Sequence, residues 1–134
     1  KMSKSYDNTI PLFAPPAELK KLLKKIKTDS TPLEDPKDPD TSSLYAMYAQ
    51  FADDDQRADL RRRMLAGGIG WGHVKEVFFQ VLDAHLSAPR EHYAELMADR
   101  AGLDAILEAG AERARVRARE VVGNVRRAIG IDGD

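Results

Sequence analysis

The sequence predicts an all-α fold, in which a helical bundle follows a short loop segment. Three observations predict it: apolar residues recur at three- and four-residue spacing, proline is concentrated before residue 40, and aromatic residues form only 7% of the chain. Hydrophobic residues form 43% and charged residues 32%, enough to fill and to coat one helical core. A length of 134 residues fits one domain of ordinary size.

The first 40 residues are predicted to hold one helix between loops. Residues 1–13 are polar and then briefly extended, and a helix begins near Pro15 or Pro16, because proline is tolerated in the first turn. The apolar face of this helix consists of Leu19, Leu22, Leu23 and Ile26. Residues 28–40 carry three prolines and no periodic pattern, so they are predicted to form a connector.

Two shorter helices are predicted next. Thr41 or Ser42 caps the first of them. Its inner face consists of Leu44, Met47, Tyr48 and Phe51. Three aspartates at 53–55 open the other helix, which ends at Gly67-Gly68. Its apolar residues are Leu60, Met64 and Leu65.

Two long helical segments complete the chain, after a glycine-rich bend around Trp71. The first has apolar positions from 74 to 97, and Pro89 is expected to bend or break it. The second runs from 103 to 129, with Gly110 as a possible break. One apolar stripe on it consists of Leu103, Ile106, Leu107, Ala111, Ala114, Ala118, Val121, Val122, Val125 and Ile129.

Charge is unevenly distributed, although the formal net charge is only −1. Residues 1–27 hold seven lysines against two acids, and residues 28–59 hold nine acids against two basic residues. The remaining residues are nearly balanced. The chain therefore has no global positive field, but its first block is suited to meeting an anion and its second would repel one.

Several functional classes are excluded by composition. The absence of cysteine rules out disulfides, a thiol nucleophile and a cysteine-based metal site. His73, His85 and His92 lack the spacing of a helical zinc motif, so no metal site is expected. No apolar run is long enough to span a membrane and no signal peptide is visible, which predicts a soluble, cytoplasmic protein without a membrane partner.

The chain opens with the residues Lys1-Met2-Ser3-Lys4-Ser5. This string resembles the signature loop of class I aminoacyl-tRNA synthetases. Further runs at 26–30, 36–42, 67–75 and 110–114 resemble the C-terminal part of bacterial tryptophanyl-tRNA synthetases, so that the resemblance extends to about Ile131. Because the motif stands at position one, we expect the chain to be a fragment that begins inside a larger protein.

The resemblance implies a role in ATP-dependent activation of an amino acid. Lys1 and Lys4 would be the phosphate-binding lysines, with Lys4 acting on the transition state, and Met2, Ser3 and Ser5 would complete the ATP-binding loop. A lysine ammonium acts as a point charge, and two of them can contact oxygens of the departing pyrophosphate. The family uses ATP with Mg²⁺, on a Rossmann-type nucleotide-binding fold that lies upstream of Lys1 and is missing here.

The resemblance also implies a domain arrangement and an RNA partner. Residues 1–13 would end the catalytic domain, 14–40 would form a lysine-rich helix and connector, and 41–134 would be the helical anticodon-binding domain for tRNA(Trp). Candidate tRNA-binding residues are Arg61, Arg62, Arg63, Arg115, Arg119, Arg126 and Trp71. The alternatives, solvated arginine faces and a packing role for Trp71, are the interpretations that the sequence favours for each residue taken singly.

The expected function is therefore part of a tryptophan–tRNA ligase, a nucleotide-binding enzyme of protein biosynthesis. Tryptophan would be bound by the missing upstream half, the intact enzyme would be a homodimer, and this chain alone would be inactive. Three alternatives stay open at this point: a tyrosyl-tRNA synthetase relative, a non-enzymatic RNA-binding helical module, and a helical protein-interaction domain.

Overall fold

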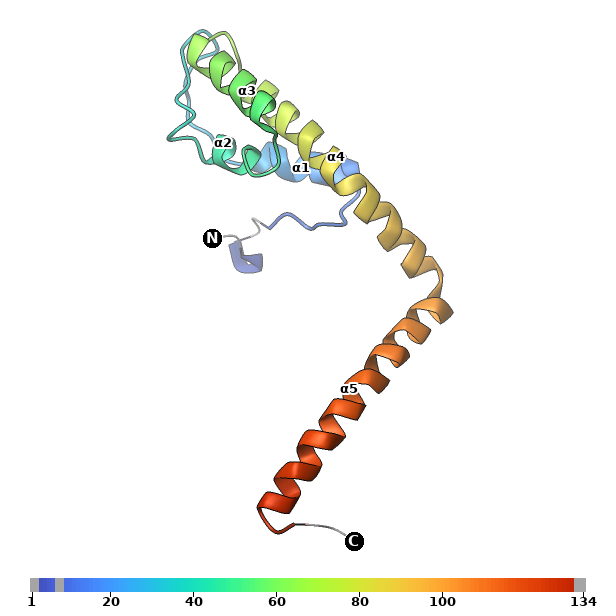
Figure 1. Ribbon diagram of the computed structural model, residues 1–134. Coiled ribbons are helices and arrows are strands. Elements are labelled where there is room, and N and C mark those ends of the chain that lie inside the picture. Colours follow the sequence, from blue (N-terminus) through green and yellow to red (C-terminus); the bar gives the residue numbers. More distant parts are fainter. Residues whose placement is uncertain (1–2, 7–8, 132–134) are drawn as a thin grey trace. The chain divides into compact units, whose positions relative to one another are not determined.

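The computed structural model describes residues 3–6 and 9–131 (Figure 1). Over these residues the chain is helical and forms no strand, which confirms the predicted all-α fold. The chain divides into two compact units, residues 1–91 and residues 92–134. None of the described helices combines the length and the apolar character that crossing a membrane requires.

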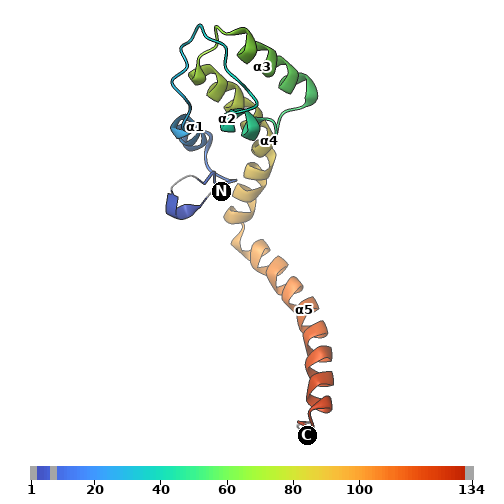
Figure 2. The same cartoon turned by 90° about the vertical axis from the view of Figure 1, so that its left-hand side faces the viewer.

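The first unit contains a 3-10 turn at Lys4–Tyr6 and the helices α1 (Pro16–Lys25), α2 (Ser43–Tyr48) and α3 (Asp54–Ala66). It also contains most of α4 (Trp71–Ala98). Figures 1 and 2 show α1, α2 and α3 gathered along the first part of α4. Helices α3 and α4 form a hairpin, because only four residues connect them.

Local sequence signals set where these helices begin. Helix α1 begins at Pro16, as predicted. Ser42, rather than Thr41, caps α2 by accepting a hydrogen bond from the backbone N–H of Tyr45 at 3.2 Å. Asp53 and Gln56 form a reciprocal capping box at the start of α3, with distances of 2.8 and 3.0 Å.

One hydrophobic core holds the first unit together, and each of its four helices contributes to it. Its buried residues are Leu19, Leu23, Leu44, Tyr48, Ala52, Leu60, Met64, Ile69, Val74, Phe78, Leu82 and Leu86. Phe78 lies fully buried at the centre, with its ring 6.4 Å from that of Tyr48 and edge-on to it. Met47 is partly buried and packs against this core, and the Phe51 ring lies 6.3 Å from that of Phe78, so the predicted inner face of α2 is confirmed. Of the apolar residues predicted for α3, Leu60 and Met64 are buried and Leu65 is exposed.

The hairpin between α3 and α4 turns on glycines. Helix α3 ends at Ala66, and Gly67 and Gly68 follow with φ of 75° and 73°. A Cβ on Gly67 would lie 2.3 Å from the backbone oxygen of Glu34, so a side chain there would collide with the connector. The predicted bend around Trp71 is shorter than expected, because Trp71 already begins α4.

Helix α4 runs through Pro89 without interruption, so of the two predicted outcomes, a bend or a break, the break is wrong. Proline removes the hydrogen bond to the carbonyl of the residue four positions earlier, here His85. Both residues are exposed, so water can satisfy that carbonyl. The buried face of α4 before this point provides packing that offsets the loss.

The second unit consists of the last turns of α4 and of α5 (Arg100–Ala128). Asp99 caps α5 by accepting a hydrogen bond from the N–H of Gly102 at 2.9 Å. The helix continues through Gly110 and does not break there. No residue of α5 is buried, so its apolar stripe forms no part of a core among the described residues.

Candidate functional site

The signature segment forms a tight turn. The N–H of Tyr6 donates to the carbonyl of Ser3 at 3.1 Å, and the N–H of Ser5 donates to the Ser3 hydroxyl oxygen at 3.2 Å. The two serine hydroxyls lie 2.5 Å apart, and Ser5 is exposed. Lys1, Met2 and the Lys4 side chain, which sequence reasoning placed on ATP, lie outside the described residues.

Helix α1 docks on α4 through lysine contacts made in both directions. The Lys20 ammonium lies 2.8 Å from a Glu76 carboxylate oxygen and 5.1 Å from the centre of the Phe79 ring. In return, the Lys75 ammonium donates to the carbonyl of Lys24 at 2.9 Å and to that of Ile26 at 2.6 Å. A cation thus satisfies the free carbonyls at the C-terminal end of α1, which favours this docked position.

The three candidate arginines of α3 are engaged with acidic residues. The Arg61 guanidinium donates two hydrogen bonds, of 2.6 and 2.7 Å, to the Asp40 carboxylate, and so connects α3 to the connector. Arg62 pairs with Asp59. Arg63 lies 3.5 Å from the same carboxylate. These pairs offset much of the positive charge of α3.

The pair between Asp40 and Arg61 predicts a pH-dependent contribution to stability. The hydrogen bond from Arg61 holds the pKa of Asp40 below its ordinary value of 3.8. A lowered pKa in the folded state stabilises the fold above pH 3.8, and this stabilisation is lost as the pH falls through the lowered pKa.

We therefore expect Asp40→Asn to lower the melting temperature at pH 7, and the difference from the unmodified chain to shrink as the pH falls below 3.8 and through the lowered pKa of Asp40. Thermal unfolding followed by circular dichroism measures this. Asp104→Asn, at an exposed position of α5, is the control. A difference that persists unchanged at acidic pH would contradict the electrostatic origin.

The candidate arginines of α5 are exposed to solvent. Arg115 lies 3.2 Å and Arg119 3.5 Å from oxygens of one carboxylate, that of Glu112. Arg126 is exposed in the last turn and has no ion pair among the described residues. This end of α5 therefore presents positive charge that is less neutralised than that of α3.

Trp71 is held by a hydrogen bond to a carboxylate and lies close to a cation. Its indole N–H donates to the Asp29 carboxylate at 2.9 Å, and the Lys37 ammonium lies 5.8 Å from the ring centre. Two hydrogen bonds from Thr31, and then the one from Trp71, lower the pKa of Asp29. The ring thus fastens α4 to the connector, which favours the packing interpretation over a free stacking platform.

Lys37 is the residue that sequence reasoning missed. It is 1% exposed, and its ammonium donates to the carbonyls of Pro32 at 2.7 Å and of Asp35 at 3.2 Å. Its backbone N–H donates to the carbonyl of Met64 near the end of α3, at 2.8 Å. The one local signal is its place between Pro36 and Pro39, which gives no hint of burial.

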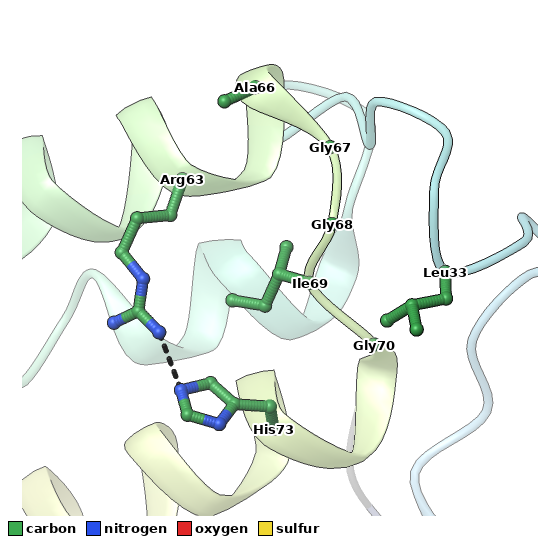
Figure 3. Close-up of a pocket in the computed structure, with 8 residues that line it drawn as sticks. All are labelled: Leu33, Arg63, Ala66, Gly67, Gly68, Ile69, Gly70 and His73. Atoms are coloured by element: carbon green, nitrogen blue, oxygen red, sulfur yellow. Dashed lines mark hydrogen bonds between the residues drawn. The ribbon is translucent and has the colours of Figure 1, made fainter.

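A hollow of about 450 Å³ lies beside the α3–α4 turn. We call it the glycine-turn hollow. Its lining residues are Leu33, Arg63, Ala66, Gly67, Gly68, Ile69, Gly70 and His73. Figure 3 shows Arg63 and His73 reaching toward each other from α3 and α4, and an Arg63 N–H donates to Nε2 of His73 at 2.6 Å. Sequence reasoning named Arg63 but did not join it to His73 or to the turn.

The comparisons with known proteins point to one group of enzymes. No family model matches the chain. The tryptophan–tRNA ligase of Pseudomonas aeruginosa is 45% identical over 131 residues, which are 98% of this chain and 29% of that protein. The enzyme of Neisseria meningitidis is 44% identical, and the match covers 98% of this chain and 39% of that protein.

A solved structure agrees with these sequence relatives. The tryptophanyl-tRNA synthetase of Campylobacter jejuni is 39% identical and superimposes with a TM-score of 0.91, over 97% of this chain and 42% of that one. A second structure of the same protein, with equal identity and TM-score, contains ADP and tryptophan.

The chain is therefore homologous to a segment of the aminoacyl-tRNA ligases. More particularly, it matches the bacterial tryptophan–tRNA ligases, and it spans less than half the length of these relatives. The resemblance inferred from the sequence is confirmed.

Proposed function

We propose that this chain is part of a tryptophan–tRNA ligase, which activates tryptophan with ATP and transfers it to tRNA(Trp). The observation that carries the proposal is 45% identity to a protein of that name over 98% of the chain. The tyrosyl alternative loses support, because the relatives and solved structures described above are all tryptophan enzymes. The whole activity belongs to the longer protein, and we expect this chain alone to be inactive.

Residues 1–5 are proposed to bind the phosphates of ATP. Lys1 and Lys4 would contact oxygens of the departing pyrophosphate, and Met2, Ser3 and Ser5 would shape the loop around the nucleotide. The turn closed by Ser3 and Tyr6 supports a compact loop, and the Campylobacter jejuni enzyme has been solved with ADP. Positioning and charge stabilisation are the main contributions that proteins make to such chemistry.

Mg²⁺ belongs to the same proposal. When bound with ATP, the ion offsets charge on the phosphates. The described residues offer no cluster of three or more metal-ligating side chains, so they do not fit a metal site of their own. The ion would reach this loop on the nucleotide.

The helices are proposed to bind tRNA, with 41–134 as the anticodon-binding domain, 14–40 as the connecting helix and segment, and 1–13 as the end of the catalytic domain. Tryptophan would be bound elsewhere in the longer protein, which we propose to act as a homodimer in the cytoplasm. Exposed arginines near the end of α5 support RNA contact, because phosphate groups dominate the affinity of such complexes.

Salt dependence of tRNA binding tests this role. We expect the 134-residue chain to bind tRNA(Trp), with an affinity that falls as salt rises. Arg126→Gln should reduce the slope of log K against log salt by about one if Arg126 meets a phosphate. Arg61→Gln should reduce it less, because Arg61 is already held by Asp40.

Electrophoretic or anisotropy titrations over a salt series measure both slopes. Absence of tRNA binding at low salt would contradict the RNA-binding role. Binding that is retained, with no aminoacylation after the longer protein is restored, would instead favour the non-enzymatic RNA-binding alternative.

A further inference from the structure

We propose that the glycine-turn hollow receives one unstacked base of a single-stranded RNA segment. This inference rests on the proposed RNA-binding function and names a site for it. Sequence-specific recognition of RNA mostly concerns bases that are turned out of loops, stacked on planar side chains and paired along their edges. The hollow provides each of these elements within the first unit.

Its walls suit a flat, apolar ligand. Leu33 enters from the connector and is 53% exposed, and Ile69 and Ala66 add apolar surface (Figure 3). Three of the four residues between α3 and α4 are glycines, and the fourth, Ile69, is 5% exposed. A Cβ built on Gly68 would find no atom within 4 Å, so the space beside it is open.

Two planar side chains meet at this hollow. Arg63 and His73 are joined by their hydrogen bond of 2.6 Å, and the His73 ring is exposed. Imidazole rings and guanidinium planes are both surfaces on which bases stack. Because Arg63 is held between Asp59 and His73, its plane is fixed before a ligand arrives, which lowers the entropy cost of binding.

The charges around the hollow favour a base over a phosphate. The carboxylate of Asp59 lies 3.5 Å from Arg63 and offsets the one positive charge that lines the hollow. Because this charge is already paired, it attracts a phosphate less strongly, whereas a neutral base needs no such charge. Among the described residues, the backbone N–H groups of Gly68 and Gly70 donate to no protein atom, so they are available to acceptors on the edge of a base.

The test uses the 134-residue chain and fluorescent RNA hairpins that carry the anticodon loop of tRNA(Trp), measured by anisotropy. His73→Ala removes a stacking surface and should weaken binding on the order of tenfold. His73→Phe keeps a ring and should retain most of the affinity. Gly68→Asn adds a side chain at a residue that lines the hollow, with a positive φ that Asn tolerates, and should weaken binding to a similar extent.

Gly130→Asn is the matched control for Gly68→Asn. Gly130 has φ of 71° and open space around it, but it follows α5 and does not line the hollow. We expect RNA affinity to be unchanged in this variant. Thermal unfolding of each variant confirms that the fold is retained.

A set of hairpins with one abasic nucleotide at successive loop positions identifies the bound base. At one position the abasic change should weaken binding to the unmodified chain about as much as His73→Ala does, and the two losses should not add. RNA binding that is insensitive to His73→Ala and Gly68→Asn would overturn this inference and leave the proposed function standing. Absence of RNA binding altogether would overturn both.

Discussion

Replacing Lys4 by alanine in the full-length ligase should slow activation of tryptophan on the order of 100-fold, while the dissociation constant of ATP changes far less. Activation breaks the bond between the α-phosphate of ATP and pyrophosphate. Negative charge grows on the leaving group only as that bond breaks. An ammonium that contacts the leaving group therefore stabilises the transition state more than the bound substrate.

Two measurements on the same variant separate these effects. Pyrophosphate exchange gives the activation rate, and equilibrium titration gives the affinity for ATP. Lys21→Ala is the matched control, because Lys21 is an exposed lysine of α1 outside the signature segment. Equal losses of rate and affinity for Lys4→Ala would show that the lysine binds ATP uniformly, and would contradict its proposed role in the transition state.

Local signals in the sequence predicted where most helices begin and end. Pro16, Ser42 and Asp53 mark three helix starts, and Gly67 marks an end, because each acts through its own backbone or its nearest neighbours. The breaks that were expected at Pro89 and at Gly110 are absent, and both expectations rested on local signals of the same kind. The free-energy cost of one glycine in a helix interior is about 1 kcal/mol and that of one proline about 3 kcal/mol, and such a cost alone does not end a long helix.

Contacts between distant residues could not be predicted in this way. Asp40 meets Arg61 and Asp29 meets Trp71 across 21 and 42 positions, and no periodic pattern encodes such pairs. The glycine-turn hollow shows the same limit, because its residues come from the connector, α3, the turn and α4. The sequence showed which arginines the chain contains. Only the fold shows which of these arginines are already paired with acidic residues.

Lys37 gives the largest expected effect on stability. Its ammonium lies in the interior, bonded to two carbonyls of the connector and near the Trp71 ring of α4. The backbone N–H of Lys37 donates to Met64 of α3. Lys37→Ala leaves those carbonyls without this donor and opens a cavity where the stem packed. We expect the free energy of unfolding of the first unit to fall by about 3 kcal/mol.

Urea unfolding followed by the fluorescence of Trp71, the single tryptophan of the chain, measures this change at the site itself. Lys37→Met separates the two causes, because methionine keeps most of the buried stem but donates no hydrogen bond. It should lose roughly half as much stability as Lys37→Ala. Lys21→Ala should change stability by less than about 0.5 kcal/mol, as expected for an exposed position. If Lys37→Met were as stable as the unmodified chain, packing alone would hold the connector, and the two hydrogen bonds of the ammonium would contribute nothing net.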